Sequence, residues 1–375
     1  MTRVGIPAAM RTRRGFLAAL ATPVLAHGSL RRIYPPERVR YPDPATEFEV
    51  QRLTDPGHTC YLPPTYGRVF GRRGDFLVYA GDRDGSFQAY ALDLKSWESR
   101  QLTEAKALDR GSLTLTADDR AVCFVDAGEL KVAPVSGSSA ARKVYGLSRE
   151  SKPGSGVSCI PFGPSALVVD GQSRLLLVHL TKGDTKLLAS SQDPMSDPIP
   201  RPRRASVLYR TGDGGLWIAH LDASRNFRLK TAPGRNGPAR WAPDGRTILY
   251  LSYTDDGKPN TLREHNPDNG EDRLVAPTTQ FVQFSCNPDA SVFVGASGSK
   301  ASPYVLLLLR AARRELTPCE HRCANPSDVA PIFSPNSQQV FFQSERHGKP
   351  ALYAMNIDRL VEKTEDEEEA ARAPR

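Results

Sequence analysis

The feature of this 375-residue sequence that most constrains its fold is a repeat of about 40 to 50 residues. Each copy begins with a turn, which is followed by an apolar strand such as FLVYAG at 76–81 or QVFFQS at 339–344, a polar loop and a second apolar strand. A more polar strand closes most copies. The turns lie at 70–74, 115–119, 160–164, 201–204, 241–245, 285–289 and 333–337. Four-stranded units at this period are typical of the blades of a β-propeller.

The two ends of the repeat region complement each other. The last copy ends at Ile357 without a closing strand, and Phe48–Gly57 (FEVQRLTDPG) is a closing strand without a unit of its own. Pairing these two ends would close a ring and remove the exposed edges of an open array. No helical period competes with the strands. We therefore predict an all-β protein, a seven-bladed β-propeller over residues 48–361 that is closed by strands from both termini.

The N-terminus resembles a twin-arginine export signal. Arg13 and Arg14 precede Phe16-Leu17, a short apolar segment follows, and Val24-Leu25-Ala26 resembles a cleavage site. About a dozen apolar residues are too few to span a bilayer. The alternative is a buried N-terminal helix. We predict a Tat signal peptide at 1–26, an N-terminal extension at 27–47, and a periplasmic or secreted protein. The acid-rich residues 362–375 are expected to be a disordered tail.

The charge balance indicates the class of partner. The formal net charge is +8, and residues 1–26 contribute four arginines and no acid, so export would leave +4. A basic body suits acidic partners such as polyuronates or nucleic acid, although it is also a common solubility feature. A periplasmic location argues against nucleic acid. We expect a monomer with no transmembrane segment and no nucleic-acid partner.

Six cysteines would be able to form disulfides in an oxidising compartment, but the sequence does not fix their pairing. Cys123, Cys159 and Cys286 lie in or beside apolar strands and are expected in the core. Cys319, His321 and Cys323 form the run CEHRC, which suggests a metal site. Because no second pair follows at zinc-like spacing, a local disulfide or plain packing is favoured. The full set is Cys60, Cys123, Cys159, Cys286, Cys319 and Cys323.

Two levels of family resemblance are present. WAPDGRTILYLS at 241–252 and FSPNSQQVFFQS at 333–344 resemble the TolB-type propeller repeat, whose hallmark is an aromatic residue, x-Pro-Asp-Gly and a strand. Glu49–Ala105 is similar to the start of oligogalacturonate lyases, notably in RLT at 52–54, Thr59-Cys60, Gly81-Asp82 and QLTE at 101–104. These lyases are seven-bladed propellers of pectin degradation, so the resemblance implies that fold and an acidic oligosaccharide as ligand.

The resemblance also shows where this chain departs from the family. Cleaving a polyuronate by β-elimination needs a base and a group that neutralises the carboxylate. The family's His-Pro-His-Pro metal run falls on Asp328–Pro331, and a third histidine ligand falls on Gln283. Its glutamine ligand falls near Asn325, its catalytic histidine on Pro238 and its catalytic arginine on Gly215. We carry over no catalytic residue, and we expect manganese or another divalent cation only if oxygen ligands replace the histidines.

The candidate ligand-binding residues are those on the inner strands, near the channel mouth. Tyrosine rings stack on sugars, and one arginine can donate two parallel hydrogen bonds to a carboxylate. The alternative is that these side chains merely line a wet channel. The candidates are Tyr61, Tyr66, Arg68, Asp197, Arg201, Arg240, Gln283, Asn325 and Asp328.

Each of three further clusters has two alternative interpretations, one functional and one purely structural. Strand alternation places Arg263 and His265 on one face, where His265 is either a general base or, more commonly, a satisfied histidine. The turn from Asp82 to Gly85 is either a calcium site or an ordinary polar loop. Arg201–Arg204 is either a basic patch or an exposed edge.

Two functional hypotheses follow. The first is an exported oligogalacturonate-lyase-like propeller that acts on or binds acidic oligosaccharides such as pectin fragments, with β-elimination in question because the histidines are absent. The second is a TolB-like periplasmic protein-interaction propeller without catalysis. A peptidase propeller is excluded, because it would need a hydrolase domain with Gly-x-Ser-x-Gly, which this sequence does not contain.

Overall fold

The structure, a computed structural model, describes residues 1, 32–137, 140–150, 152, 156–253, 260–278, 280–358 and 360–361. Apart from Met1, the predicted signal peptide lies outside these residues, as does the predicted acidic tail at 362–375. Within the described ranges, no helix is long and apolar enough to cross a membrane.

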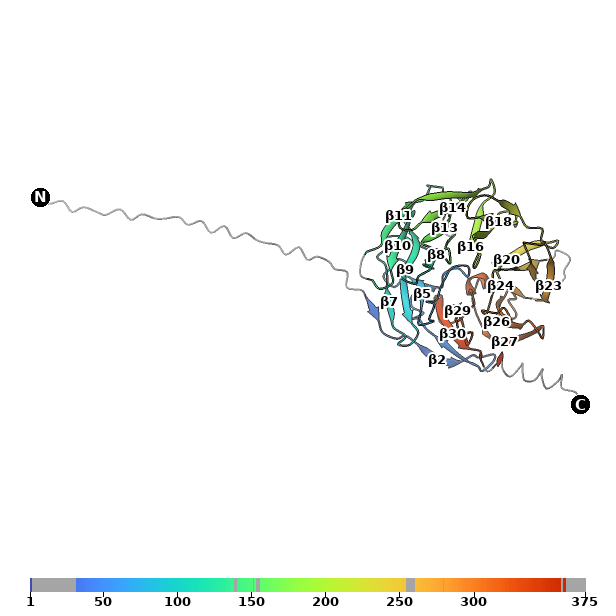
Figure 1. The fold of residues 1–375 in the computed structure, drawn as a ribbon. Coiled ribbons are helices and arrows are strands. Elements are labelled where there is room, and N and C mark those ends of the chain that lie inside the picture. The colour runs from blue at the N-terminus through green and yellow to red at the C-terminus, as the bar shows by residue number, and fades with distance from the viewer. Residues whose placement is uncertain are drawn as a thin grey trace, which may run out of the picture. The chain divides into compact units, whose positions relative to one another are not determined.

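Seven antiparallel sheets are arranged around a common axis (Figure 1). The predicted seven-bladed propeller is therefore confirmed. We number them blades 1 to 7 in the order of their first strands. In blades 2 to 6 the four strands pair in chain order.

Blades 1 to 4 contain the following strands: β4 (Cys60–Tyr61), β5 (Phe76–Gly81), β6 (Gln88–Asp93) and β7 (Ser99–Gln101) in blade 1; β8 (Leu108–Leu115), β9 (Ala121–Asp126), β10 (Glu129–Pro134) and β11 (Arg142–Gly146) in blade 2; β12 (Val157–Cys159), β13 (Ser165–Asp170), β14 (Arg174–His179) and β15 (Thr185–Ser190) in blade 3; β16 (Met195–Pro200), β17 (Ser206–Thr211), β18 (Leu216–His220) and β19 (Asn226–Arg228) in blade 4.

Blades 5 to 7 contain the remaining strands: β20 (Arg235–Trp241), β21 (Ile248–Tyr253), β22 (Thr261–His265) and β23 (Asp272–Pro277) in blade 5; β24 (Phe281–Cys286), β25 (Val292–Ser297), β26 (Tyr304–Leu309) and β27 (Arg314–Glu320) in blade 6; β28 (Ile332–Phe333), β29 (Gln339–Ser344) and β30 (Ala351–Asn356) in blade 7. A 3-10 turn, η1 (Pro326–Val329), precedes β28.

Both termini build blade 7. The N-terminal strand β3 (Glu49–Arg52) pairs with the C-terminal strand β30, with Val50 opposite Met355 and Arg52 opposite Tyr353. The predicted closure of the ring is therefore confirmed. Two short strands from the predicted N-terminal extension lengthen the sheets: β2 (Val39–Pro42) pairs with β3, and β1 (Ile33–Tyr34) pairs with β7.

The apolar core of the described chain consists of seven clusters, one between each pair of neighbouring blades. The cluster between blades 7 and 1, for example, packs Phe341 and Leu352 against Leu77 and Tyr79. Because each blade is covered on both faces, residues of both parities are buried, and all of β5 except Phe76 is buried. This explains why the strands read as continuous apolar runs rather than as alternating ones.

The TolB-type turn is built as its sequence predicts. Gly245 has φ +71°, and a Cβ there would lie 2.3 Å from the carbonyl oxygen of Pro202, so this position admits only glycine. Arg201 also holds this turn. Its Nε donates to Gly245 O at 2.7 Å, and its guanidinium lies over the ring of Trp241. These contacts join the turns of blades 4 and 5.

A buried ion pair fastens the N-terminal segment to the ring. Arg346, in the β29–β30 loop, contacts Asp43 at 2.9 Å, and their side chains are 4% and 0% exposed. Arg346 also donates to the carbonyl of Glu320 in blade 6. Asp43 further accepts hydrogen bonds from the backbone N–H groups of Ala45 and Thr46. One arginine thus links blade 6, blade 7 and the N-terminal strands.

We predict that Arg346→Met lowers the free energy of unfolding by about 3–5 kcal/mol, because it leaves the Asp43 carboxylate buried without its cation. The measurement is urea unfolding followed by tryptophan fluorescence. The control is Arg40→Met, whose pair with Glu49 is 58% and 56% exposed. That variant should change stability by less than about 1 kcal/mol. Equal, small effects of both changes would contradict the proposed fastening role.

Candidate ligand-binding cleft

Leu62–Arg68, which we call the plug segment, crosses the axis of the propeller. At one end the N–H of Leu62 donates to Gln343 of blade 7, and at the other the N–H of Arg68 donates to Thr114 Oγ1 of blade 2 at 3.0 Å. Between them Tyr66 packs against the cluster that joins blades 4 and 5. The segment therefore contacts blades on opposite sides of the ring and divides the channel.

A cleft of about 700 Å³ lies on one side of the plug segment. A smaller pocket of about 350 Å³ shares only Thr65 and Tyr66 with it and lies toward the turns that begin each repeat. The cleft is lined mainly by first strands of blades, by the plug segment and by η1. Its polar lining consists of Tyr61, Tyr66, Asp109, Arg110, Asp197, Arg210, Gln283, Asp328 and Gln343, together with Thr65 and Ser327.

Tyr61 and Arg110 form an aromatic–cation pair at this site. The Arg110 guanidinium lies 3.7 Å from the centre of the Tyr61 ring. Burial raises the pKa of Tyr61, while the arginine opposes that rise, so the phenol is neutral. Arg110 is exposed and forms no ion pair within the described ranges. A guanidinium stacked on a ring keeps its edge N–H groups available for a carboxylate.

Asp197 and Arg210 form a second pair, at 3.3 Å. Asp197 has φ +51° and lies at an irregularity in the pairing of β16 with β17. Arg210 also donates to Asn236 O at 3.0 Å and to Gly237 O. Burial raises the pKa of Asp197, although Arg210 partly offsets the effect. A left-handed aspartate with a raised pKa in a cleft is typical of functional positions.

Tyr66 forms the floor of the cleft. Burial raises the pKa of Tyr66 well above its usual value, and the nearby carboxylates of Asp197 and Asp109 raise it further. The hydroxyl therefore stays protonated and is available as a hydrogen-bond donor.

Blades 6 and 7 complete the wall through η1. Asn325 caps this turn, because its side chain accepts from Ser327 N at 3.2 Å and donates to Asp328 Oδ2 at 3.2 Å. Gln343 holds the turn to the plug segment, since its amide donates to Asp328 O and accepts from Leu62 N. Gln283, on β24, lies beside them in the lining.

The structure brings five of the nine predicted ligand-binding residues together in the cleft. These are Tyr61, Tyr66, Asp197, Gln283 and Asp328. Asn325 lies next to the cleft as the cap of η1 rather than in its lining.

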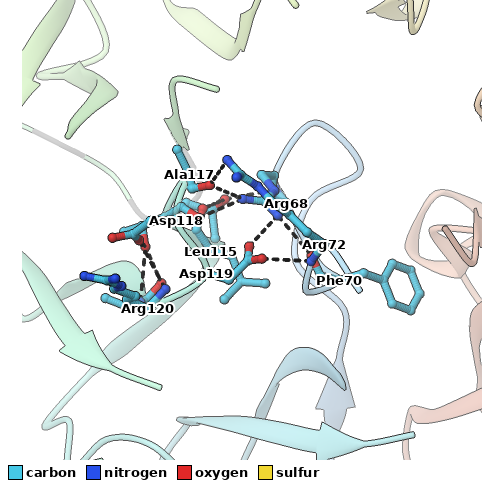
Figure 2. A network of polar contacts seen from close by, with 11 residues as sticks. Arg68, Phe70, Arg72, Leu115, Ala117, Asp118, Asp119 and Arg120 are labelled. Carbon is cyan, nitrogen blue, oxygen red and sulfur yellow. Dashed lines mark hydrogen bonds and ion pairs between the residues drawn. The ribbon is translucent and has the colours of Figure 1, made fainter. Parts of the chain in front are cut away.

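The three predicted arginines lie elsewhere. Arg68 turns away from the cleft and contacts Asp119 and the carbonyls of Thr116 and Ala117, as Figure 2 shows for its bonds to Asp119 and Ala117. Arg201 is buried in the joint between blades 4 and 5, where it pairs with Asp268. Arg240 lines the smaller pocket on the other side of the plug segment. Arg68 and Arg240 precede repeat turns and Arg201 begins one; Arg68 and Arg201 hold turns, and Arg240 lies on the other side of the plug segment.

Sequence reasoning missed Asp109, Arg110, Arg210 and Gln343. Arg110 lies in β8, where the pairing with β9 is irregular between Asp109 and Thr114, so simple strand alternation does not predict its direction. The signal that was available is Gly111, because a glycine within a strand often marks a bulge. Arg210 lies on the second strand of its blade, and we considered only first strands.

The side chains of the remaining clusters are engaged in ion pairs and hydrogen bonds, and the predicted alternative of an exposed edge does not hold for Arg201, which is buried. His265 is buried and contacts Asp272 at 3.3 Å, and Arg263 contacts the same carboxylate at 2.6 Å, so the two do share a face. Asp84 pairs with Arg32, and Asp82 accepts from Thr59 N. Arg204 pairs with Asp268.

The CEHRC run forms neither a metal site nor a disulfide. All six cysteines are free thiols. His321 is fully buried, with Nε2 3.0 Å from Ser297 O and Nδ1 accepting from Cys323 N–H. This arrangement fixes the neutral tautomer with the proton on Nε2, and burial lowers the pKa of His321 accordingly. Its role is to hold a loop.

The cleft does not offer the ligands of a metal site. Among the described residues, no three His, Cys, Asp or Glu side chains are placed to hold one ion. Pro238, at the position of the family's catalytic histidine, lines the cleft but has no donor side chain. Asp328 is already hydrogen-bonded to Asn325, and Ala330 replaces a histidine beside it. The residues present do not fit the histidine-bound metal that the family resemblance implies.

Comparison with known proteins agrees with this architecture. A family model described as oligogalacturonate lyase matches residues 36–141. An oligogalacturonide lyase of Pectobacterium atrosepticum is 24% identical over 370 residues, which cover 84% of this chain and 95% of the relative.

Two solved structures share the fold. An oligogalacturonate lyase in complex with manganese has a TM-score of 0.78 at 22% identity, covering 87% of this chain and 97% of its own. An oligogalacturonate lyase from Vibrio parahaemolyticus has a TM-score of 0.79 at 22% identity, covering 87% and 98%. The matching family model and the full-length relative show that this chain resembles oligogalacturonate lyases, and the two solved structures show that it shares their propeller fold.

Proposed function

We propose that the cleft binds acidic oligosaccharides of the pectin type, without the histidine–metal chemistry of the family. The observation that carries this proposal is Arg110, an exposed cation that lies on the Tyr61 ring inside the cleft and is not neutralised by a described carboxylate. A uronate carboxylate would accept two hydrogen bonds from this guanidinium. The cleft volume of about 700 Å³ is within the range of small-ligand sites.

The other polar groups of the cleft suit sugar hydroxyls. Tyr66 offers a protonated hydroxyl, and Gln283 offers an amide. Asp328 supplies a carboxylate that accepts hydrogen bonds. Saccharide sites commonly combine aromatic faces with such planar polar groups. The described lining of the cleft contains no histidine, and no metal-ligand set is present among the described residues, so the proposal is one of binding.

A second candidate function is binding of a basic peptide, the interaction-propeller alternative. The specific observation in its favour is that three carboxylates, Asp109, Asp197 and Asp328, line the cleft against two arginines. Of the two arginines, Arg210 is already paired with Asp197. This excess of carboxylates over arginines would attract a lysine-containing peptide. It would also limit how many uronates can bind.

We also propose that the protein is exported by the twin-arginine route and acts in the periplasm or outside the cell. The basis is the sequence of residues 1–26, with its paired Arg13 and Arg14. An exported location is where pectin fragments would be met.

Changing Arg110→Gln should weaken trigalacturonate binding about tenfold or more, because a charge-assisted contact to the ligand carboxylate is lost. The measurement is isothermal titration calorimetry on the mature chain. The matched control, Arg246→Gln, removes an 81%-exposed arginine outside the cleft and should bind as the unchanged protein does. An affinity that is insensitive to Arg110 would remove the cleft as the uronate site.

Trigalacturonate affinity should rise as the pH falls through the raised pKa of Asp197. Burial raises this pKa, so the carboxylate takes up a proton at a higher pH than an unperturbed aspartate does, and its repulsion of the ligand's carboxylates then disappears. Asp197→Asn should bind more tightly at neutral pH and show a flatter profile. The contrary result is a parallel pH profile in both proteins, measured by the same calorimetry.

Export should depend on the paired arginines. Replacing Arg13 and Arg14 by lysines should leave the protein in the cytoplasm of a host with an active twin-arginine pathway. Cell fractionation and immunoblotting provide the measurement, and a Thr12→Ala variant serves as the control. Equal periplasmic amounts of the double-lysine variant and the unchanged protein would refute this route.

A further inference from the structure

We propose a second ligand site in a groove between blades 2 and 3, for a small anion whose charged group adjoins a ring face. The groove encloses about 480 Å³, and we call it the arginine groove because Arg72, Arg120 and Arg142 line it together with Phe162. It shares no lining residue with the cleft and lies beside the pocket on the other side of the plug segment, with which it shares Cys159 and Pro161.

The charges in the groove favour an anion. None of its three arginines forms an ion pair with a carboxylate in the described part of the chain. The single acidic residue in the lining is Asp118, which is occupied by hydrogen bonds from Thr116 Oγ1 at 2.7 Å and the N–H of Arg120 at 3.1 Å. Three guanidinium groups against one carboxylate leave a local excess of positive charge.

The guanidinium groups of two of the arginines are held in place by backbone carbonyls. Arg72 donates to the carbonyl of Ala117, and its N–H donates to Asp119 at 2.8 Å (Figure 2). Arg142 donates to the carbonyl of Leu180 at 2.6 Å. A carbonyl orients a guanidinium without cancelling its charge, so both cations are positioned in advance for a ligand. Arg120, whose backbone N–H donates to Asp118 Oδ1 at 3.1 Å, completes the set (Figure 2).

An exposed aromatic ring lies at the same groove. Phe162 is 41% exposed in the turn Pro161-Phe162-Gly163-Pro164. Gly163 has φ +81°, and the two prolines restrict the backbone on either side of it. The ring is therefore presented by a stiff turn, and little entropy would be lost when a ligand packs on it. Exposed aromatic rings beside cations suit ligands that combine an apolar face with a negative charge.

This chemistry is shared by sugar acids and by phosphorylated rings, and it does not depend on the function proposed for the cleft. The test uses Arg110→Gln as the background, so that uronate binding in the cleft does not obscure the groove. Digalacturonate, phenyl phosphate and inorganic phosphate are titrated by calorimetry. Binding of digalacturonate alone would identify a sugar-acid site, and binding of phenyl phosphate alone a phosphate site; either supports the proposal.

In this background, Arg120→Gln should weaken binding of the ring-bearing anion about tenfold or more. Phe162→Ala should weaken it as well but should leave the weak binding of inorganic phosphate unchanged, because phosphate has no ring face. The matched control is Arg73→Gln, an exposed arginine of the neighbouring turn that lines neither the groove nor the cleft. It should bind as the background protein does.

Three results would overturn the proposal. They are the absence of binding for all three probes, equal affinities in Arg120→Gln and Arg73→Gln, and binding of phenyl phosphate that is insensitive to Phe162→Ala. None of these results bears on the cleft, whose own test depends on Arg110 in the otherwise unchanged protein.

Discussion

The rest of this structure depends on the packing of each blade against both of its neighbours. Seven apolar clusters alternate with seven sheets, so the first and the last blade are covered on both faces only because the ring closes. Closure is provided by β3 pairing with β30, and the buried pair of Arg346 and Asp43 fastens the segment that carries β3. Burial of apolar area is the dominant favourable contribution to folding, and joining the two ends of the chain extends this burial to the terminal blades. The channel along the axis of the ring is the space left for ligand binding.

The plug segment turns that axis into two separate spaces. Without Leu62–Arg68 the channel would run through the propeller, but the contacts of this segment with blades 2, 4, 5 and 7 divide it into a cleft and a smaller pocket. The cleft occupies the positions at which the related lyases are expected to hold their metal and base. In this chain those positions are Pro238, Gln283 and Asp328, while the charged groups come from Arg110 and the pair of Asp197 and Arg210. The fold is thus shared with oligogalacturonate lyases, whereas the side chains that line the cleft are this chain's own.

The fold could be predicted from the sequence, because repeat spacing and apolar runs report directly on blades that are buried on both faces. FLVYAG at 76–81 and QVFFQS at 339–344 form the strands expected of them. The candidate site was predicted only in part. Tyr61 and Asp328 line the cleft as expected. Arg68 and Arg201 instead hold turns, because each has a carboxylate and backbone carbonyls within hydrogen-bonding distance. Arg110 was missed because the irregular pairing of β8 breaks the alternation from which side-chain direction is inferred.

The central claim is that the cleft binds an acidic oligosaccharide through its own arginine and aromatic groups rather than through a metal. The most direct measurement is a calorimetric titration of the mature protein with trigalacturonate, once with a chelator and once with added manganese. The account predicts binding with the same affinity in both solutions. Binding that appears only with manganese, or no binding in either solution while a lysine-rich peptide binds, would contradict it.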